Sequence, residues 1–120
     1  MNEYQEKLRA TMDQYVHFVY NMTEQYPKSE LYGSVSQWRR ATLSVILNYI
    51  EGYARQKPLV RLNFLTISFG SLKESKYLLD FSRRRGYVSD QDYGVGTKLA
   101  EEISAMLWTE ISFLKRFIRS

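Results

Sequence analysis

Basic side chains gather in several short stretches of this chain, and aromatic side chains lie among them. The 17 Lys and Arg residues outnumber the 13 Asp and Glu residues, so the formal net charge is +4. Arginine and lysine bind phosphate groups, and tyrosine rings stack on unpaired bases. This pattern permits contact with nucleic acid or another polyanion, although many soluble proteins without such a partner are as basic. The candidate binding residues are Arg39, Arg40, Arg55, Lys57, Arg61, Arg83, Arg84 and Arg85, with Tyr32, Tyr53 and Tyr87 beside them.

Three serines are the only candidates for a nucleophile cluster. Ser68, Ser71 and Ser75 recur at helical spacing, but the single histidine, His17, is the only imidazole that could act as their base. Small residues at this spacing, with Gly70 among them, instead favour the close approach of two helices. The serines are therefore predicted to be packing residues.

Carboxylates could bind metals or act as acids, but their setting indicates structural roles. Glu110 falls within an apolar stripe, where an unpaired charge would be costly, so we expect an ion pair with Arg40 or Arg61. Bundles that hold two metals use Glu-x-x-His pairs, and this sequence has none. It also has no cysteine, which excludes thiolate metal sites. The apolar stripe around Glu110 consists of Leu99, Ile103, Met106, Leu107, Leu114, Phe117 and Ile118. No catalytic residue, cofactor or metal is predicted.

Hydrophobic periodicity predicts four helices that position these residues. Ser34 and Ser89 suit N-caps, Pro58 suits a first turn, and Gly86 suits a left-handed C-terminal position. Short connections between long helices favour antiparallel neighbours, so we predict an all-α, up-down-up-down four-helix bundle. The predicted helices cover residues 3–25, 34–53 or 34–55, 58–86 and 89–120 of a single domain, 1–120.

The antiparallel order predicts one basic and aromatic end. The third helix ends beside the start of the second, so the arginines of 83–85 are expected near Tyr32 and Arg39. Cations in the last turn of a helix also stabilise its dipole, which gives residues 83–85 a purely structural alternative.

The composition excludes several classes of protein. A chain of 120 residues suits one compact domain with a modest core. There is no run of about 18 apolar residues, and acids stand near the N-terminus where a signal peptide would be apolar. We therefore expect a cytoplasmic protein that neither spans a membrane nor is secreted.

The second helix has two apolar faces, more than a monomeric bundle requires. Leu43, Ile46, Leu47 and Ile50 form one face, which we assign to the core, while Trp38, Val45 and Tyr49 form the other. The second face is either an oligomer interface anchored by aromatics or part of a helix buried between both neighbours. A third, polar stripe predicts a hydrogen-bonded network between helices or subunits; it contains Gln37, Arg40, Ala41, Ser44, Asn48 and Glu51.

Three motifs carry a resemblance to a known family. They are Gln37-x-Arg39-Arg40-Ala41, Asn48-x-x-Glu51-Gly52 and Gly70-Ser71-Leu72-x-Glu74. Together they resemble the four-helix-bundle proteins encoded in intervening sequences of 23S ribosomal RNA, over most of the chain. The resemblance implies small bacterial bundles that assemble into pentameric rings with basic surfaces and have no established catalysis.

A similar bundle is the accessory variability determinant of diversity-generating retroelements, a nucleic-acid-binding pentamer that partners a reverse transcriptase. From the residues and this resemblance we expect a non-enzymatic homo-oligomer, pentameric by resemblance, that binds nucleic acid, with RNA as the favoured target. The alternative is an oligomeric scaffold for a protein partner such as a retroelement reverse transcriptase.

Overall fold

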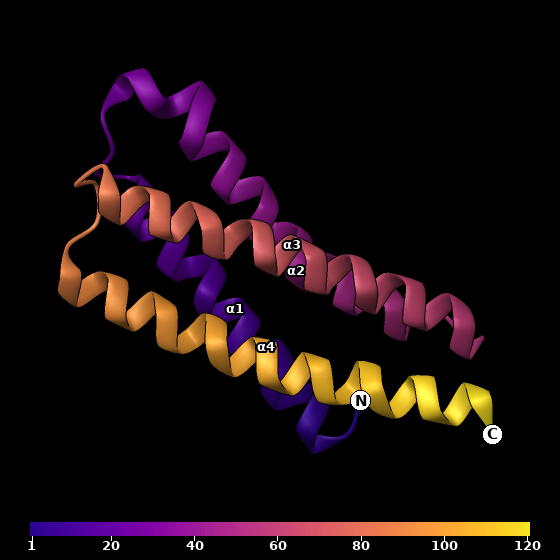
Figure 1. Ribbon diagram of the computed structural model, residues 1–120. Coiled ribbons are helices and arrows are strands. Elements are labelled where there is room, and N and C mark those ends of the chain that lie inside the picture. The colour runs from indigo at the N-terminus through magenta and orange to yellow at the C-terminus, as the bar shows by residue number, and fades with distance from the viewer.

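The computed structural model describes all 120 residues and contains four long helices and no strand (Figure 1). Consecutive helices run antiparallel, as predicted for an all-α four-helix fold. None of them has the length and apolar character needed to cross a bilayer. The helices are α1 (Glu3–Thr23), α2 (Ser36–Tyr53), α3 (Pro58–Arg84) and α4 (Asp90–Arg119), with a 3-10 turn η1 (Lys28–Glu30) and a π-helix η2 (Leu31–Val35) between α1 and α2.

Several of the predicted helix ends are confirmed. Ser89 caps α4, because its Oγ accepts a hydrogen bond from the Asp92 backbone N–H at 3.1 Å. Pro58 lies in the first turn of α3, where a missing N–H costs no helical hydrogen bond. The chain leaves α3 through Gly86, whose φ of +77° is rarely adopted by residues with a side chain.

The start of α2 differs from the prediction. Ser34 caps no helix, because it lies inside η2, and α2 begins at Ser36. Helical turns start directly after Pro27, which is extended, and they continue through a kink at Gly33 with φ −110° and ψ −112°. The turn-forming residues after Pro27 therefore build an irregular helical entry instead of a loop.

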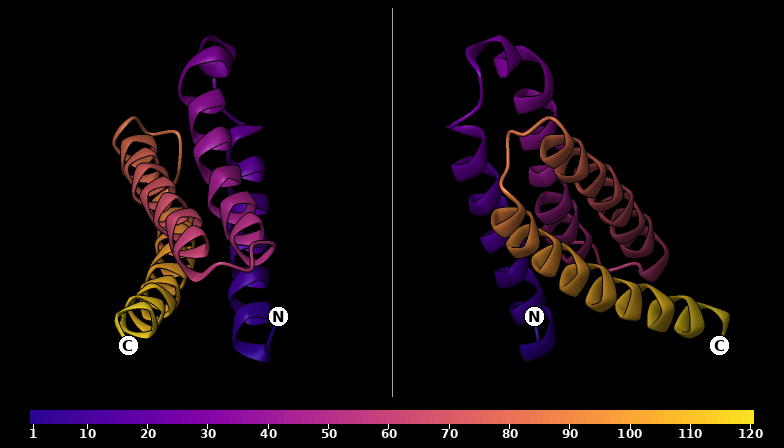
Figure 2. Two further views of the ribbon diagram at one scale, coloured as in Figure 1. Left: turned by 90° about the vertical axis from the view of Figure 1, so that its right-hand side faces the viewer. Right: turned by 60° about the vertical axis from the view of Figure 1, so that its left-hand side comes forward.

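The helices form two layers that are inclined to each other (Figure 2). α1 lies beside α2 and α3 beside α4, and α2 also packs along α3. The core fills the space between the layers, and its largest fully buried side chains are Tyr15, Trp38 and Tyr49. α4 diverges from α1 toward its C-terminus, so Phe117 and Ile118 are exposed although they were predicted to face inward.

Ser75 is the centre of a buried hydrogen-bond cluster that joins three helices. Its Oγ lies 2.9 Å from the Tyr15 hydroxyl and 2.7 Å from the Thr42 hydroxyl, and it accepts a bond from Trp38 Nε1 at 3.1 Å. Ser68 donates to a backbone carbonyl of α2 at 2.6 Å. The prediction that these serines serve helix packing is confirmed.

The glycine that permits a close contact between helices is not the predicted one. A Cβ atom on the exposed Gly70 would meet nothing within 4 Å, so this glycine serves no contact inside the chain. Gly96 of α4 is buried, and a Cβ there would lie 2.6 Å from the Phe18 ring and 3.1 Å from Leu79. Close approach of α1 and α4 therefore depends on Gly96.

Candidate nucleic-acid interface

The face of α2 that was predicted as an oligomer interface belongs to the core of the single chain. Trp38, Val45 and Tyr49 are 0%, 1% and 0% exposed. These side chains retain no surface for another subunit, so their assignment as interface anchors is wrong. The physical reason is size: α2 packs on α1 and α3 together, and the larger aromatic face fills the space between the layers.

The other apolar face of α2 was predicted to be the core but is only partly buried: Leu43 and Ile46 are half-buried, and Ile46 packs against the core. Leu47 is 58% exposed, and Ile50 is also exposed. Ile67 of α3, 51% exposed, lies at the same level. Leu47 follows Ser44 by about one turn, Ile67 precedes Ser71 by about one turn, and the two serine hydroxyls are 2.7 Å apart. We call Leu47, Ile50 and Ile67 the outer strip.

Part of the predicted polar stripe forms a network between α2 and α3. Gln37 Nε2 donates to Glu74 Oε1 at 2.8 Å, and Ser44 bonds to Ser71. Asn48 Nδ2 donates to Ser44 Oγ at 2.9 Å. The interpretation as a network between helices is confirmed for these three residues of the stripe. Ala41 is instead buried in the core, Arg40 is exposed, and Glu51 pairs with Arg55 one turn later.

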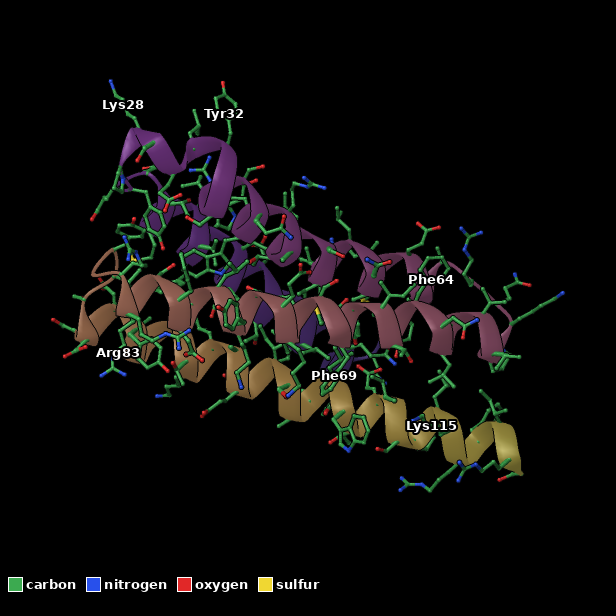
Figure 3. All side chains as sticks on the ribbon, turned by 45° about the horizontal axis from the view of Figure 1, so that its top comes forward. Lys28, Tyr32, Phe64, Phe69, Arg83 and Lys115 are labelled. Atoms are coloured by element: carbon green, nitrogen blue, oxygen red, sulfur yellow. The ribbon has the colours of Figure 1, made fainter.

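An aromatic and basic cleft lies where η2 meets α1. Its volume is about 340 Å³. Tyr32 at its edge is 93% exposed and projects away from the bundle (Figure 3). We call this cavity the kink cleft; it is lined by Tyr20, Leu31, Tyr32, Val35, Ser36, Arg39 and Arg40.

Two arginines line the kink cleft, one held in place and one free. Arg39 Nε donates to Thr23 Oγ1 at 2.8 Å, and its guanidinium carbon lies 4.5 Å from the centroid of the Tyr20 ring. Arg40 is exposed and belongs to none of the ion pairs of the structure. The cleft therefore combines a positioned cation with one that is free to meet an anion.

Arg83 lies at this end of the molecule but on the opposite side from the kink cleft (Figure 3). Its Nε donates to Asp90 Oδ1 at 2.9 Å, and this bond raises the pKa of Arg83. Its guanidinium also lies 4.6 Å from the centroid of the Tyr93 ring. Arg84 and Arg85 are exposed. The single basic end predicted from the sequence is thus split, because the groups lie on different layers of the bundle.

Tyr32 is the one tyrosine of the three candidates that stays free. The Tyr87 hydroxyl donates to Glu30 at 3.1 Å, and its ring packs 4.8 Å from that of Tyr26. Tyr53 donates to a carboxylate of α4. Both rings are therefore engaged within the fold.

Three basic residues lie around the connection between α2 and α3: Arg55, Lys57 and Arg61. This connection is at the opposite end of α2 from η2 (Figure 1). Arg55 pairs with Glu51 one turn earlier. Arg61 donates to the carbonyls of Gly52 at 3.2 Å and Arg55 at 2.9 Å, so it caps the C-terminus of α2. Of these three residues, only Lys57 is both exposed and absent from the ion pairs of the structure.

Glu110 binds two tyrosines and not the arginine that was predicted. Its carboxylate oxygens accept hydrogen bonds from the hydroxyls of Tyr49 and Tyr53. Burial, together with these bonds, raises the pKa of both tyrosines. The ion pair with Arg40 or Arg61 is absent, because Arg40 points to solvent and Arg61 is held by the carbonyls of α2.

The residues considered for catalysis are engaged separately. His17 lies on the exposed side of α1, with Nε2 3.5 Å from Asp13 Oδ1. Ser68 and Ser75 are buried and hydrogen-bonded within the core. No group of three or more His, Cys, Asp and Glu side chains is placed to hold a metal ion.

Tyr20 is the functional candidate that sequence reasoning missed. It follows the core residue Val19 at the border of the apolar face of α1, a position from which a tyrosine can reach a neighbouring helix. That border position was the available signal. The partner of Tyr20 is Arg39 of α2. This pairing depends on how α1 and α2 pack, which hydrophobic periodicity along the sequence does not predict.

Comparisons with known proteins agree with this fold. A family model described as 23S rRNA-intervening sequence protein matches residues 7–109. A crystal structure of a protein of unknown function from the S23 ribosomal protein family of Bacteroides thetaiotaomicron VPI-5482 aligns with a TM-score of 0.83 and 18% identity, over 91% of this chain and 98% of that one. At this identity the likeness concerns the fold. No curated protein matches the chain. Because the family model spans most of the sequence, the chain belongs to the 23S rRNA-intervening sequence protein family.

Proposed function

We propose that this chain is a non-enzymatic, oligomeric four-helix bundle that binds RNA through its basic surface. The observation that carries the proposal is the kink cleft, where the almost fully exposed Tyr32 lies beside Arg39 and Arg40. An aromatic ring next to guanidinium groups can bind a base and a phosphate together.

Exposed cations without an acidic partner at both ends of the bundle extend this surface. Arg40, Lys57, Arg84 and Arg85 are exposed and belong to none of the ion pairs. Phosphate contacts of this kind are individually weak, and they gain affinity through effective concentration when they are repeated in an assembly. A pentamer, the state implied by the resemblance, would carry +20 from five chains of +4 each.

The outer strip supports an oligomer. Leu47, Ile50 and Ile67 are exposed aliphatic side chains. Gly70, one turn after Ile67, leaves open space above the backbone of α3. A second chain could therefore approach α3 closely and cover the strip, which would remove apolar surface from water.

RNA binding is tested by fluorescence anisotropy with a labelled RNA, over salt concentrations from about 50 to 200 mM. The logarithm of the binding constant is expected to fall linearly with the logarithm of the salt concentration, because each neutralised phosphate releases counterions. An unmodified protein that binds no RNA near 50 mM salt would reject the proposal.

Matched variants locate the contact surface. Arg40→Gln should flatten the salt slope by about one contact, because the free Arg40 can neutralise a phosphate. Arg83→Gln is the control, since Arg83 is already compensated by Asp90. A larger change of slope in the control than in Arg40→Gln would move the interface to the end of α3, where Arg84 and Arg85 are its remaining cations.

A protein scaffold is the second candidate, and a specific observation favours it. Trp108, Phe113 and Phe117 of α4 are all exposed, and exposed aromatics are typical of protein interfaces. The test is binding to a purified retroelement reverse transcriptase, measured by calorimetry with unmodified protein and with Phe113→Ser. Binding that this substitution abolishes, together with no RNA binding, would support the scaffold function.

A further inference from the structure

We propose that the kink cleft holds one unpaired nucleotide, with its base stacked on Tyr32 and its phosphate on Arg40, so that the protein prefers single-stranded RNA to duplex. The inference rests on the proposed function and adds the conformation of the RNA that is recognised.

The size and shape of the cleft suit one nucleotide. Its volume of about 340 Å³ is at the small end of ligand pockets, which run from about 300 to 1,000 Å³. The irregular η2 helix carries Tyr32 outward at its edge (Figure 3). In a duplex both faces of each internal base are stacked on neighbours, so the Tyr32 ring can reach only a base that is unpaired.

Arg39 gives the cleft a rigid, cationic wall. The bond to Thr23 and the stack on Tyr20 hold its guanidinium before any ligand arrives. Arg39 also lines a neighbouring cavity of about 180 Å³, to which Lys28 contributes a second cation and Glu24 one acid. The next phosphate along a single strand can follow this path from Arg40 past Arg39 to Lys28.

Tyr32 is distinguished from the other exposed tyrosines by its freedom. The Tyr77 ring is covered on one side by the Arg84 guanidinium, 5.7 Å from its centroid. The Tyr4 hydroxyl donates to a backbone carbonyl of α4 at 2.9 Å. Tyr32 has neither restraint and is 93% exposed. A base that covers it would remove a large apolar ring from water without breaking any contact of the fold.

The experiment compares a single-stranded RNA decamer with a duplex of the same sequence, by anisotropy at fixed salt. Tyr32→Ala should weaken single-strand binding by roughly 5- to 150-fold, the effect of losing one stacked base, and leave duplex binding unchanged. Tyr32→Phe keeps the ring and should bind like the unmodified protein. Thermal unfolding of both variants confirms that the fold is intact, which is expected for so exposed a position.

Other outcomes separate the two proposals. Unchanged single-strand binding by Tyr32→Ala, or an equal loss on single strand and duplex, would overturn the assignment of the kink cleft while RNA binding itself stands. If the unmodified protein binds neither RNA, the proposed function fails first. Competition by adenosine monophosphate as strong as by the decamer would overturn the RNA assignment in favour of a free nucleotide.

Discussion

Tyr49 of α2 donates a hydrogen bond to Glu110 of α4 across the bundle. Tyr53, one turn further along α2, donates to the second carboxylate oxygen. Glu110 stands within the apolar stripe of α4, where water cannot fully solvate it. The two hydroxyls replace that solvation, and they tie together two helices that otherwise make few contacts.

Glu110→Gln should lower the free energy of unfolding by about 1.5–3 kcal/mol, the usual range for hydrogen bonds to a charged group. The amide of glutamine places an N–H donor opposite one of the two tyrosines, which then loses its acceptor. Urea denaturation measures the change. Glu102→Gln on the same helix is the control, because Glu102 meets only Lys7 at 3.8 Å near the surface and should contribute less than about 1 kcal/mol. Equal losses would refute the role of Glu110.

Stability should fall as pH rises above about 10, because the fold holds tyrosines in their neutral form. Burial raises the pKa of Tyr15 to about 12 and that of Tyr26 to about 12. Between these values and the ordinary tyrosine pKa near 10, the unfolded chain loses protons that the folded chain keeps, so deprotonation favours unfolding. The stabilisation is fully present below pH 10 and is lost as pH rises toward 12.

Denaturant midpoints measured from pH 8 to 12 check this dependence. Tyr15→Phe removes one buried phenol and should reduce the slope above pH 10. A stability that stays flat up to pH 12 would contradict the prediction.

Two glycine substitutions should have opposite effects on stability. Gly96→Ala places a methyl group 2.6 Å from the Phe18 ring and should destabilise the protein by about 1–3 kcal/mol through overpacking. Gly70→Ala meets open space and should stabilise the isolated chain by about 1 kcal/mol, the helix-propensity difference. Thermal unfolding at low protein concentration measures both, and destabilisation by Gly70→Ala under these conditions would refute the placement of Gly70.

The outer strip, and not the aromatic face of α2, should control assembly. Leu47→Glu is expected to reduce the mass seen by light scattering toward the single-chain value of 14.3 kDa while leaving the helical content unchanged. Trp38→Ala empties a core position and should cost about 3–5 kcal/mol of folding stability at any concentration. An unmodified protein that is already a single chain at micromolar concentration would reject the oligomer.

Much of the fold could be predicted from the sequence because the residues that begin and end helices act locally. Ser89 and Gly86 act on the few residues around them, and their capping roles survive in the structure. The entry to α2 was mispredicted because η1 and η2 are an irregular helical path, which turn propensities after Pro27 do not distinguish from a loop. Three residues of the candidate surface line the same cleft because they are close to one another in the chain: Tyr32, Arg39 and Arg40.

The sequence by itself determined four helices, their approximate bounds, the family motifs and the presence of two apolar faces on α2. Only the tertiary structure decided that Trp38 and Tyr49 are core while Leu47 is exposed, and that Glu110 meets tyrosines and not an arginine. The reason is physical: helical periodicity reports which side chains share a face, whereas the partner of that face depends on how helices distant in sequence pack. The separation of Arg83 from Tyr32 likewise follows from the inclined layers, which no local pattern encodes.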